Sequence, residues 1–106
     1  MASIRLAVPK TTCLGDVIEI KALIQHPMES GYRRGARGEV IERDIITRFE
    51  CTYVGETVFA ADFHAGVAAN PIVTFYTRAT ESGDLTFLWT DQNGQTWSDT
   101  AHIEVT

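Results

Sequence analysis

Apolar residues recur at every second position along most of this chain, and this spacing constrains the fold more than any other feature. The clearest run places Ile18, Ile20, Ala22 and Ile24 on one side of an extended segment. No segment shows the 3.6-residue spacing of an amphipathic helix. Successive side chains of a strand point to opposite faces, so the pattern predicts strands with one buried face. The chain is therefore predicted to be all-β.

Six further segments alternate in the same way or are rich in residues that favour strands. They are residues 4–8, 45–53, 57–63, 72–79, 84–90 and 97–105. The pairs Val54-Gly55 and Ser82-Gly83 are expected to be turns. Asn93-Gly94 is the strongest hairpin signal, because a type I′ turn needs two residues that tolerate positive φ. Seven short strands in 106 residues predict one domain, residues 1–106, with the architecture of an immunoglobulin-like antiparallel β-sandwich; a small barrel is the alternative.

The charge of the chain argues against a nucleic-acid partner. A net charge of −5 gives a mildly acidic surface, whereas nucleic-acid binding requires a basic stripe. Within residues 26–44, four basic residues (Arg33, Arg34, Arg37, Arg43) are balanced by four acidic ones (Glu29, Glu39, Glu42, Asp44). We therefore interpret this segment as a solvated loop of mixed charge.

No segment is suited to a membrane. The apolar runs are far shorter than the roughly 20 residues that a transmembrane helix needs. The first ten residues lack the apolar core of a secretion signal, which on its own predicts a cytoplasmic location.

Some of the expected strands carry apolar residues on both faces. In residues 72–79, Ile72 and Tyr76 alternate with Val73 and Phe75. A free sandwich should keep one polar face on each sheet, so a second apolar face predicts a cover, either a loop or another protein. We favour a protein. The residues predicted to contact it are Phe59, Val73, Phe75 and Leu88.

Two loops are candidates for recognition. One runs from residue 26 to residue 44, which is longer than most connections in compact domains, and the other covers residues 64–71. Loops gathered at one end of a sandwich are its usual recognition surface. The candidate recognition residues are His26, Pro27, Met28, Glu29, Gly31, Arg33, Asn70 and Pro71.

Motifs for chemistry are missing from the sequence, so no cofactor or metal is predicted. His26, Met28 and His64 could form a copper site with a cysteine if they converged, but their spacing fits no metal motif. Cys51 is expected in the core because it alternates in phase with its strand, and Cys13 is expected in a polar turn. A disulfide between the two remains open.

Three stretches together carry a family resemblance. They are HPMESG at residues 26–31, FEC at residues 49–51, and a segment with Asp62 that ends in Ala69, Asn70 and Pro71. With the surrounding sequence, from about residue 4 to residue 103, they resemble SoxZ, the Z subunit of the sulfur-carrier complex in bacterial Sox thiosulfate oxidation. Three positions depart from the pattern: Glu42 where the family often has proline, and Ala69 and Ile72 in place of an expected serine and tyrosine.

The resemblance implies a sandwich that pairs with a Y subunit, which carries sulfur intermediates on a cysteine in a glycine-rich C-terminal arm. This sequence ends in HIEVT without such an arm, so a non-catalytic role is expected. It would support the Y subunit and make transient contacts with Sox enzymes and cytochromes. The resemblance also implies a periplasmic location, reached by export with the signal-bearing partner. The alternatives are a stand-alone immunoglobulin-like recognition module and a small thiol or copper enzyme.

Overall fold

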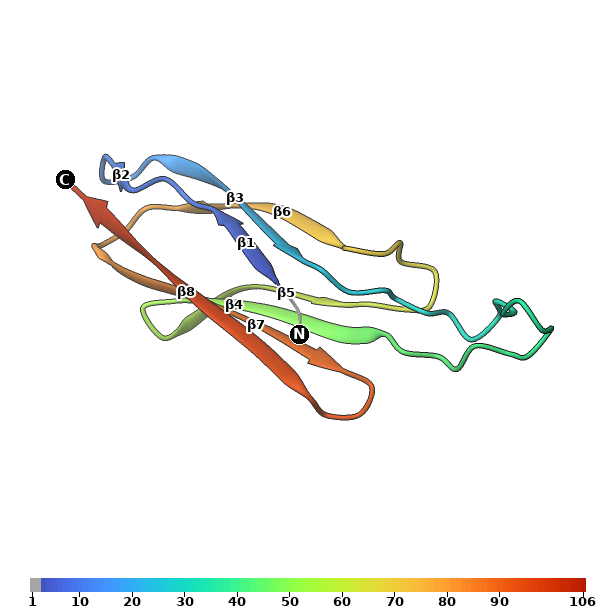
Figure 1. The fold of residues 1–106 in the computed structure, drawn as a ribbon. Coiled ribbons are helices and arrows are strands. Elements are labelled where there is room, and N and C mark those ends of the chain that lie inside the picture. The colour runs from blue at the N-terminus through green and yellow to red at the C-terminus, as the bar shows by residue number, and fades with distance from the viewer. Residues whose placement is uncertain (1–2) are drawn as a thin grey trace.

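Eight strands in two sheets make up the fold of residues 3–106, the part of the chain that the computed structural model describes (Figure 1). The strands are β1 (Ile4–Ala7), β2 (Thr11–Thr12), β3 (Val17–Ile24), β4 (Ile46–Tyr53), β5 (Glu56–Asp62), β6 (Ile72–Arg78), β7 (Gly83–Asp91) and β8 (Thr96–Val105). One sheet has the order β1-β3-β6 and the other β2-β8-β7-β4-β5. The predicted all-β, immunoglobulin-like sandwich is confirmed.

Strand β2 was not expected from the sequence. It pairs with β8 in parallel, whereas the other strand pairs are antiparallel. Two residues are too few to show an alternation, so this strand is recognised only from its hydrogen bonds to β8.

No helix in the described residues is long and apolar enough to cross a membrane.

The core lies between the two sheets and is built from the alternating residues. The four apolar residues predicted to share a face of β3 are all buried. Opposite them, Phe49 of β4 and Trp89 of β7 are fully buried with ring centroids 5.0 Å apart. Such aromatic contacts stabilise by about 0.5–1.5 kcal/mol beyond the burial of their area. Cys51 lies in the same layer, as predicted.

A bulge at the start of β4 changes the phase of the alternation. The pairing of β4 with β7 shifts between Ile46 and Arg48, and the Thr47 hydroxyl at the shift donates to the carbonyl of Thr90 at 3.2 Å. Ile45 and Ile46 are consequently both buried, although they are adjacent in sequence. A strict period of two places only one of them inside, so the bulge is a feature that the pattern does not predict.

The expected turn at Val54-Gly55 and the expected hairpin at Asn93-Gly94 are both present, but the turn type of the second differs from expectation. At residues 91–95 only Gly94 has positive φ, and its N–H donates to the carbonyl of Asp91 at 3.1 Å. The predicted type I′ turn at Asn93-Gly94 is therefore wrong. The pair of positive φ values occurs instead between β4 and β5, at Val54 (49°) and Gly55 (82°).

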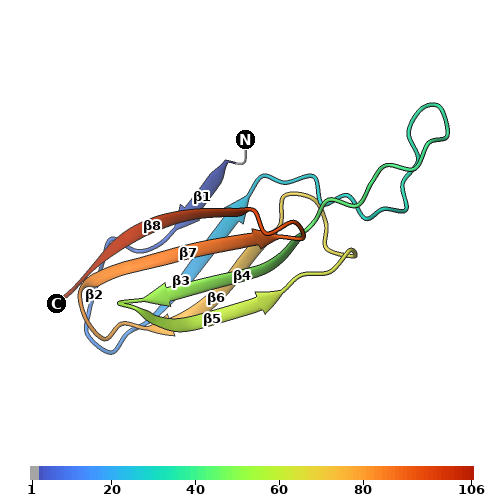
Figure 2. The same ribbon diagram turned by 90° about the horizontal axis from the view of Figure 1, so that it is seen from below.

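Residues 27–44 form an arm that projects from one end of the sandwich (Figures 1 and 2). Its outgoing and returning halves are joined by two antiparallel bridges, Glu29 with Asp44 and Arg34 with Val40. The arm makes the molecule long and narrow, with principal extents of 58 × 21 × 20 Å. Its far end is thus held well away from the sheets.

Candidate functional site

One end of the sandwich gathers the base of the arm, the loop before β6 and the turn between β7 and β8 (Figure 2). Two hydrogen bonds join the first two of these segments. The backbone N–H of His26 donates to Oδ1 of Asn70 at 3.0 Å, and the N–H of Asn70 donates to the carbonyl of His26 at 2.8 Å. The structure therefore brings together the two loops that sequence reasoning selected for recognition. Pro71, in contrast, is buried.

Backbone strain is concentrated at this junction. Met28 and Asn70 have φ values of 50° and 51°. Asparagine tolerates this left-handed region well, whereas a methionine there is uncommon. Residues held in such conformations are typically fixed by their surroundings and cluster at functional sites. The strain marks this junction as a candidate site.

His26 is buried and its ring has a defined tautomer. The N–H of Met28 donates to Nδ1 of His26 at 3.0 Å, so that nitrogen is unprotonated and the proton lies on Nε2. Nε2 faces Oδ1 of Asp44 at 3.6 Å, and the ring meets Trp97 edge to face at 5.8 Å. His26 thus fixes the entry to the arm, and its polar atoms face other parts of the same chain.

Met28 has a structural role of the same kind. Its side chain is buried, and its sulfur accepts a hydrogen bond from the backbone N–H of Ile46 at 3.3 Å. A copper ion bound to the Met28 sulfur would have to displace this internal hydrogen bond. Among residues 3–106, no three histidine, cysteine, aspartate or glutamate side chains are grouped so as to hold a metal ion.

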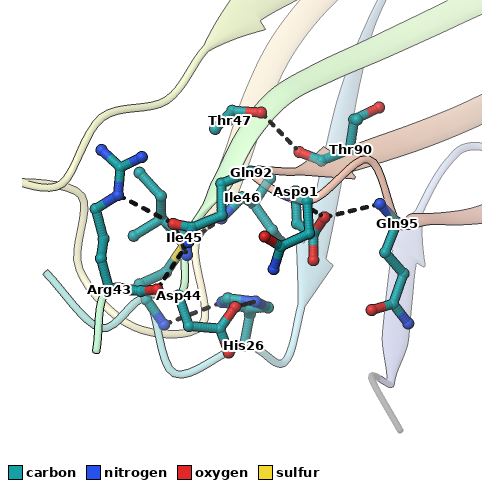
Figure 3. Close-up of polar contacts among 12 residues, drawn as sticks. His26, Arg43, Asp44, Ile45, Ile46, Thr47, Thr90, Asp91, Gln92 and Gln95 are labelled. Carbon is teal, nitrogen blue, oxygen red and sulfur yellow. Dashed lines mark hydrogen bonds and ion pairs between the residues drawn. The ribbon is translucent and has the colours of Figure 1, made fainter. Parts of the chain in front are cut away.

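The side chain of Gln92 fixes the returning half of the arm to the sandwich (Figure 3). Its Oε1 accepts from Nε of Arg43 at 3.1 Å and from the N–H of Ile45 at 3.3 Å. Its Nε2 donates to the carbonyl of Arg43 at 2.8 Å. Sequence reasoning missed this residue, because nothing local indicates that a turn glutamine bonds a segment 47 and 49 residues away.

Asp91 organises the turn beside Gln92 (Figure 3). Although buried, its Oδ1 accepts hydrogen bonds from the backbone N–H groups of Asn93 and Gln95, at 2.9 and 2.8 Å. The sequence signal that could have identified Asp91 is its position two residues before an Asn-Gly pair, which favours such a turn.

A cleft of about 300 Å³ opens between this turn and the base of the arm. It is lined by Gln25, His26, Pro27, Asp44, Asp91, Gln95 and Trp97.

The remaining predicted recognition residues lie along the arm. Arg33 and Glu29 form a two-pronged ion pair, with both N–H···O distances at 2.9 Å. The hydrogen bond from Arg33 holds the pKa of the Glu29 carboxyl below its usual value. Gly31 has a φ of 88°, and a Cβ there would lie 3.2 Å from Cβ of Arg43 in the returning half. Glycine thus lets the two halves of the arm approach closely.

The structure corrects the predicted partner interface at Val73 and Phe75. Both side chains are buried between the sheets, where Phe75 stacks on Phe59 with centroids 4.6 Å apart. They are therefore core residues that a partner cannot reach in the folded chain. Phe59 is half-buried and packs against the same core. Leu88 faces outward on the larger sheet and is 36% exposed, so its contact with a partner stays a prediction.

The apolar surface lies on the opposite face of β6, outside the smaller sheet. Ile72 is 59% exposed and Tyr76 62% exposed. Leu23 pairs with Ile72 in register, and a shallow apolar hollow of about 220 Å³ lies beside them. Large apolar residues are therefore exposed on the smaller sheet, on the opposite side of the strand from the predicted contacts. They share that face with the exposed polar residues Arg5, Glu19, Lys21, Thr74 and Arg78.

The two cysteines are both free thiols. Cys51 is fully buried, and burial raises the pKa of its thiol to about 12. A thiolate is the reactive form, so Cys51 is inert at neutral pH. Cys13 is exposed, as expected.

Comparison with known proteins gives one family match. A sequence model described as "Sulphur oxidation protein SoxZ" matches residues 4–102. No curated protein matches the sequence.

Solved structures share the fold at low sequence identity. A superoxide reductase (neelaredoxin) from Ignicoccus hospitalis superposes with a TM-score of 0.72 at 14% identity, over 98% of this chain and 80% of that one. The sulfur carrier protein SoxY from Chlorobium limicola f thiosulfatophilum superposes with a TM-score of 0.65 at 15% identity, over 97% and 78%. A CARDB domain from Pyrococcus furiosus gives 0.62 at 12% identity, over 100% and 88%. At these identities the likeness shows a common sandwich fold alone.

Proposed function

The chain belongs to the SoxZ family and is a subunit of a Sox sulfur-oxidation system, and from this premise we propose that it is the non-catalytic partner of a SoxY-type sulfur carrier. In this proposal the Y subunit holds the sulfur intermediates on its own cysteine. The present chain supplies a rigid base and docking surface for it. Export together with a signal-bearing partner, into the periplasm, belongs to the same proposal.

The exposed apolar side chains on the outer face of the smaller sheet carry this proposal. Ile72 and Tyr76 of β6 and Val17 of β3 are each more than half exposed there. The outer face of the larger sheet is mostly polar, and Leu88 is its large exposed apolar residue. A stable heterodimer buries roughly 800 Å² on each partner. This is about an eighth of the 6495 Å² surface of the chain.

The thiols of this chain are consistent with a supporting role. A carrier thiol that visits several active sites needs an exposed position on a flexible tether. Cys51 is buried in a central strand, and its raised pKa keeps it protonated. Cys13 is exposed but directly follows β2, so it is not carried on a flexible tether. In this proposal the covalent chemistry therefore belongs to the Y subunit.

Co-purification of this chain with a tagged Y subunit tests the proposal. Ile72→Asp places a charge among these apolar side chains, so we expect the two subunits to separate. Leu88→Asp places the same charge on the outside of the larger sheet and is expected to leave the complex intact. Circular dichroism of each variant checks that the strands are retained.

The outcomes separate the two faces and the function itself. Loss of the complex in Leu88→Asp but not in Ile72→Asp would move the interface to the larger sheet. Failure of the unmodified chain to bind the Y subunit would reject the pairing. Intact-mass analysis during thiosulfate turnover should find sulfur adducts on the Y subunit and none on Cys13 or Cys51.

A further inference from the structure

The fold separates charges that are balanced in the sequence. The acidic residues Glu29 and Asp44 lie at the base of the arm, where their backbones form an antiparallel β-bridge. Residues 32–40, which we name the tip, contain three arginines and one glutamate, a formal charge of +2, although one of the three, Arg33, is ion-paired with Glu29 of the base. Because the whole chain carries −5, the rest of it carries −7. The interpretation of the loop as evenly mixed in charge is therefore incomplete.

Distance makes the tip an independent electrostatic unit. The arm extends along the 58 Å axis of the molecule, away from the sheets (Figure 2). Salt at physiological strength screens charges beyond a Debye length of about 8 Å. A partner that meets the tip first therefore experiences its positive charge, while the acidic sandwich stays screened.

The tip is folded before it meets anything. The N–H of Gly35 donates to the carbonyl of Glu39 at 2.8 Å, and the N–H of Gly38 donates to the carbonyl of Gly35 at 3.0 Å. The guanidinium of Arg34 donates to the carbonyl of Gly38 at 2.9 Å. A loop already held in one shape loses less entropy on binding than a flexible one.

Two side chains of the tip are left available for contact. Tyr32 is 87% exposed, the largest value among the exposed large hydrophobic residues of the described chain. Among the described residues 3–106, the guanidinium of Arg37 forms no hydrogen bond or ion pair with another residue. Arg33, by contrast, is paired with Glu29. Tyrosine and arginine, together with tryptophan, are the residue types enriched among the hot-spot residues of protein interfaces.

We propose that the tip docks into an acidic cleft on an enzyme that acts on the carrier-bound sulfur, with Tyr32 as apolar anchor and Arg34 and Arg37 as the steering charges. This rests on the proposed function. A protein is favoured over an anionic membrane because a surface cation contributes only about 1 kcal/mol there, and the sandwich outside residues 27–44, at −5, opposes approach to an anionic surface. An enzyme cleft can receive the tip and leave the sandwich outside.

Association rates test the proposal. The complex of this chain with its Y subunit is mixed with each purified enzyme that loads, oxidises or hydrolyses carrier-bound sulfur, in low and high salt. Arg37→Glu is compared with Lys10→Glu, an exposed cation before β2 whose reversal changes the net charge equally. We expect Arg37→Glu to slow association with at least one enzyme about tenfold in low salt and less than about twofold in high salt. Lys10→Glu should change the rate less than about twofold in either.

Three results would overturn the proposal. Equal rates for the two variants with every enzyme would do so. A tenfold effect that persists in high salt would contradict steering by charge. Retention of the wild-type complex, but not of Arg37→Glu, on vesicles of equal parts phosphatidylglycerol and phosphatidylcholine would assign the tip to membranes. Co-purification with the Y subunit is measured for each variant as well. Failure of the docking proposal can therefore be distinguished from failure of the proposed function.

Discussion

Val54 holds a backbone conformation that a β-branched side chain tolerates poorly. Its φ of 49° lies in the left-handed region, which favours glycine and asparagine. Room for its side chain comes from Gly83, where a Cβ would lie 2.6 Å from Cγ2 of Val54. The turn is thus shaped by its flanking strands and by a neighbouring glycine, against the preference of its own first residue.

Val54→Asn should stabilise the domain. It creates the Asn-Gly pair that type I′ turns prefer, and the exposed valine gives up little packing. We expect the free energy of unfolding to rise by about 1 kcal/mol, measured by urea denaturation. Val40→Asn is the control, because Val40 is exposed but its φ is not positive. Equal changes in the two variants would show that the strain at Val54 is negligible.

At the level of elements, the arm depends on one glutamine of the neighbouring turn. Gln92 makes three hydrogen bonds to the returning half, while Gln95 contributes its backbone N–H to Asp91. Without these bonds the base of the arm retains its bridge and the contacts of His26. Gln92 therefore sets how firmly the arm is aimed.

Gln92→Ala should loosen the arm without unfolding the sandwich. We expect amide hydrogen exchange in residues 29–44 to accelerate severalfold, while β4 and β7 stay protected, because the local bonds are lost and the core is intact. Hydrogen exchange read by mass spectrometry measures this, with Gln95→Ala as the matched control. Unchanged exchange in the arm would mean that the Glu29–Asp44 bridge suffices.

Prediction from the sequence succeeded where one face of a strand is clearly more apolar than the other. β3 is the clear case, since the apolar residues predicted to share its inner face are all buried. β6 is the opposite case, because Ile72 and Tyr76 are about as apolar as Val73 and Phe75, and only the facing sheet decides which pair turns inward. The bulge at Thr47 and the long-range bonds of Gln92 likewise depend on partners distant in sequence.

The loops show the same division. Turn residues and loop length were enough to select His26 and Asn70, which the structure joins by two hydrogen bonds. They could not show that charges of opposite sign separate along the arm. The backbone bridge between Glu29 and Asp44 determines which residues form the base of the arm and which form its tip, and this pairing is seen only in the structure.

The whole molecule is more extended than its length requires. A compact domain of this length has a radius of gyration of about 13 Å, whereas the Cα atoms here give 16.1 Å. The difference comes from the arm, which adds length without adding to the core. An arm that keeps this shape in solution is what a distal docking element requires.

Small-angle X-ray scattering should detect the arm directly. Replacing residues 31–41 with a short glycine-serine turn should lower the radius of gyration by about 2–3 Å, toward the value for a compact domain. The melting temperature should change little, because the replaced residues lie outside the core. A wild-type radius already near the compact value would show that the arm folds back on the sandwich in solution.

The short parallel pairing of β2 with β8 has a consequence for biosynthesis. Thr11 and Thr12 pair with Glu104 and Val105, which the ribosome adds 93 residues later. All of the intervening chain must therefore be synthesised before this pairing can form. Until β8 emerges, β2 has no partner strand, so this pairing is among the last of the larger sheet to form during biosynthesis.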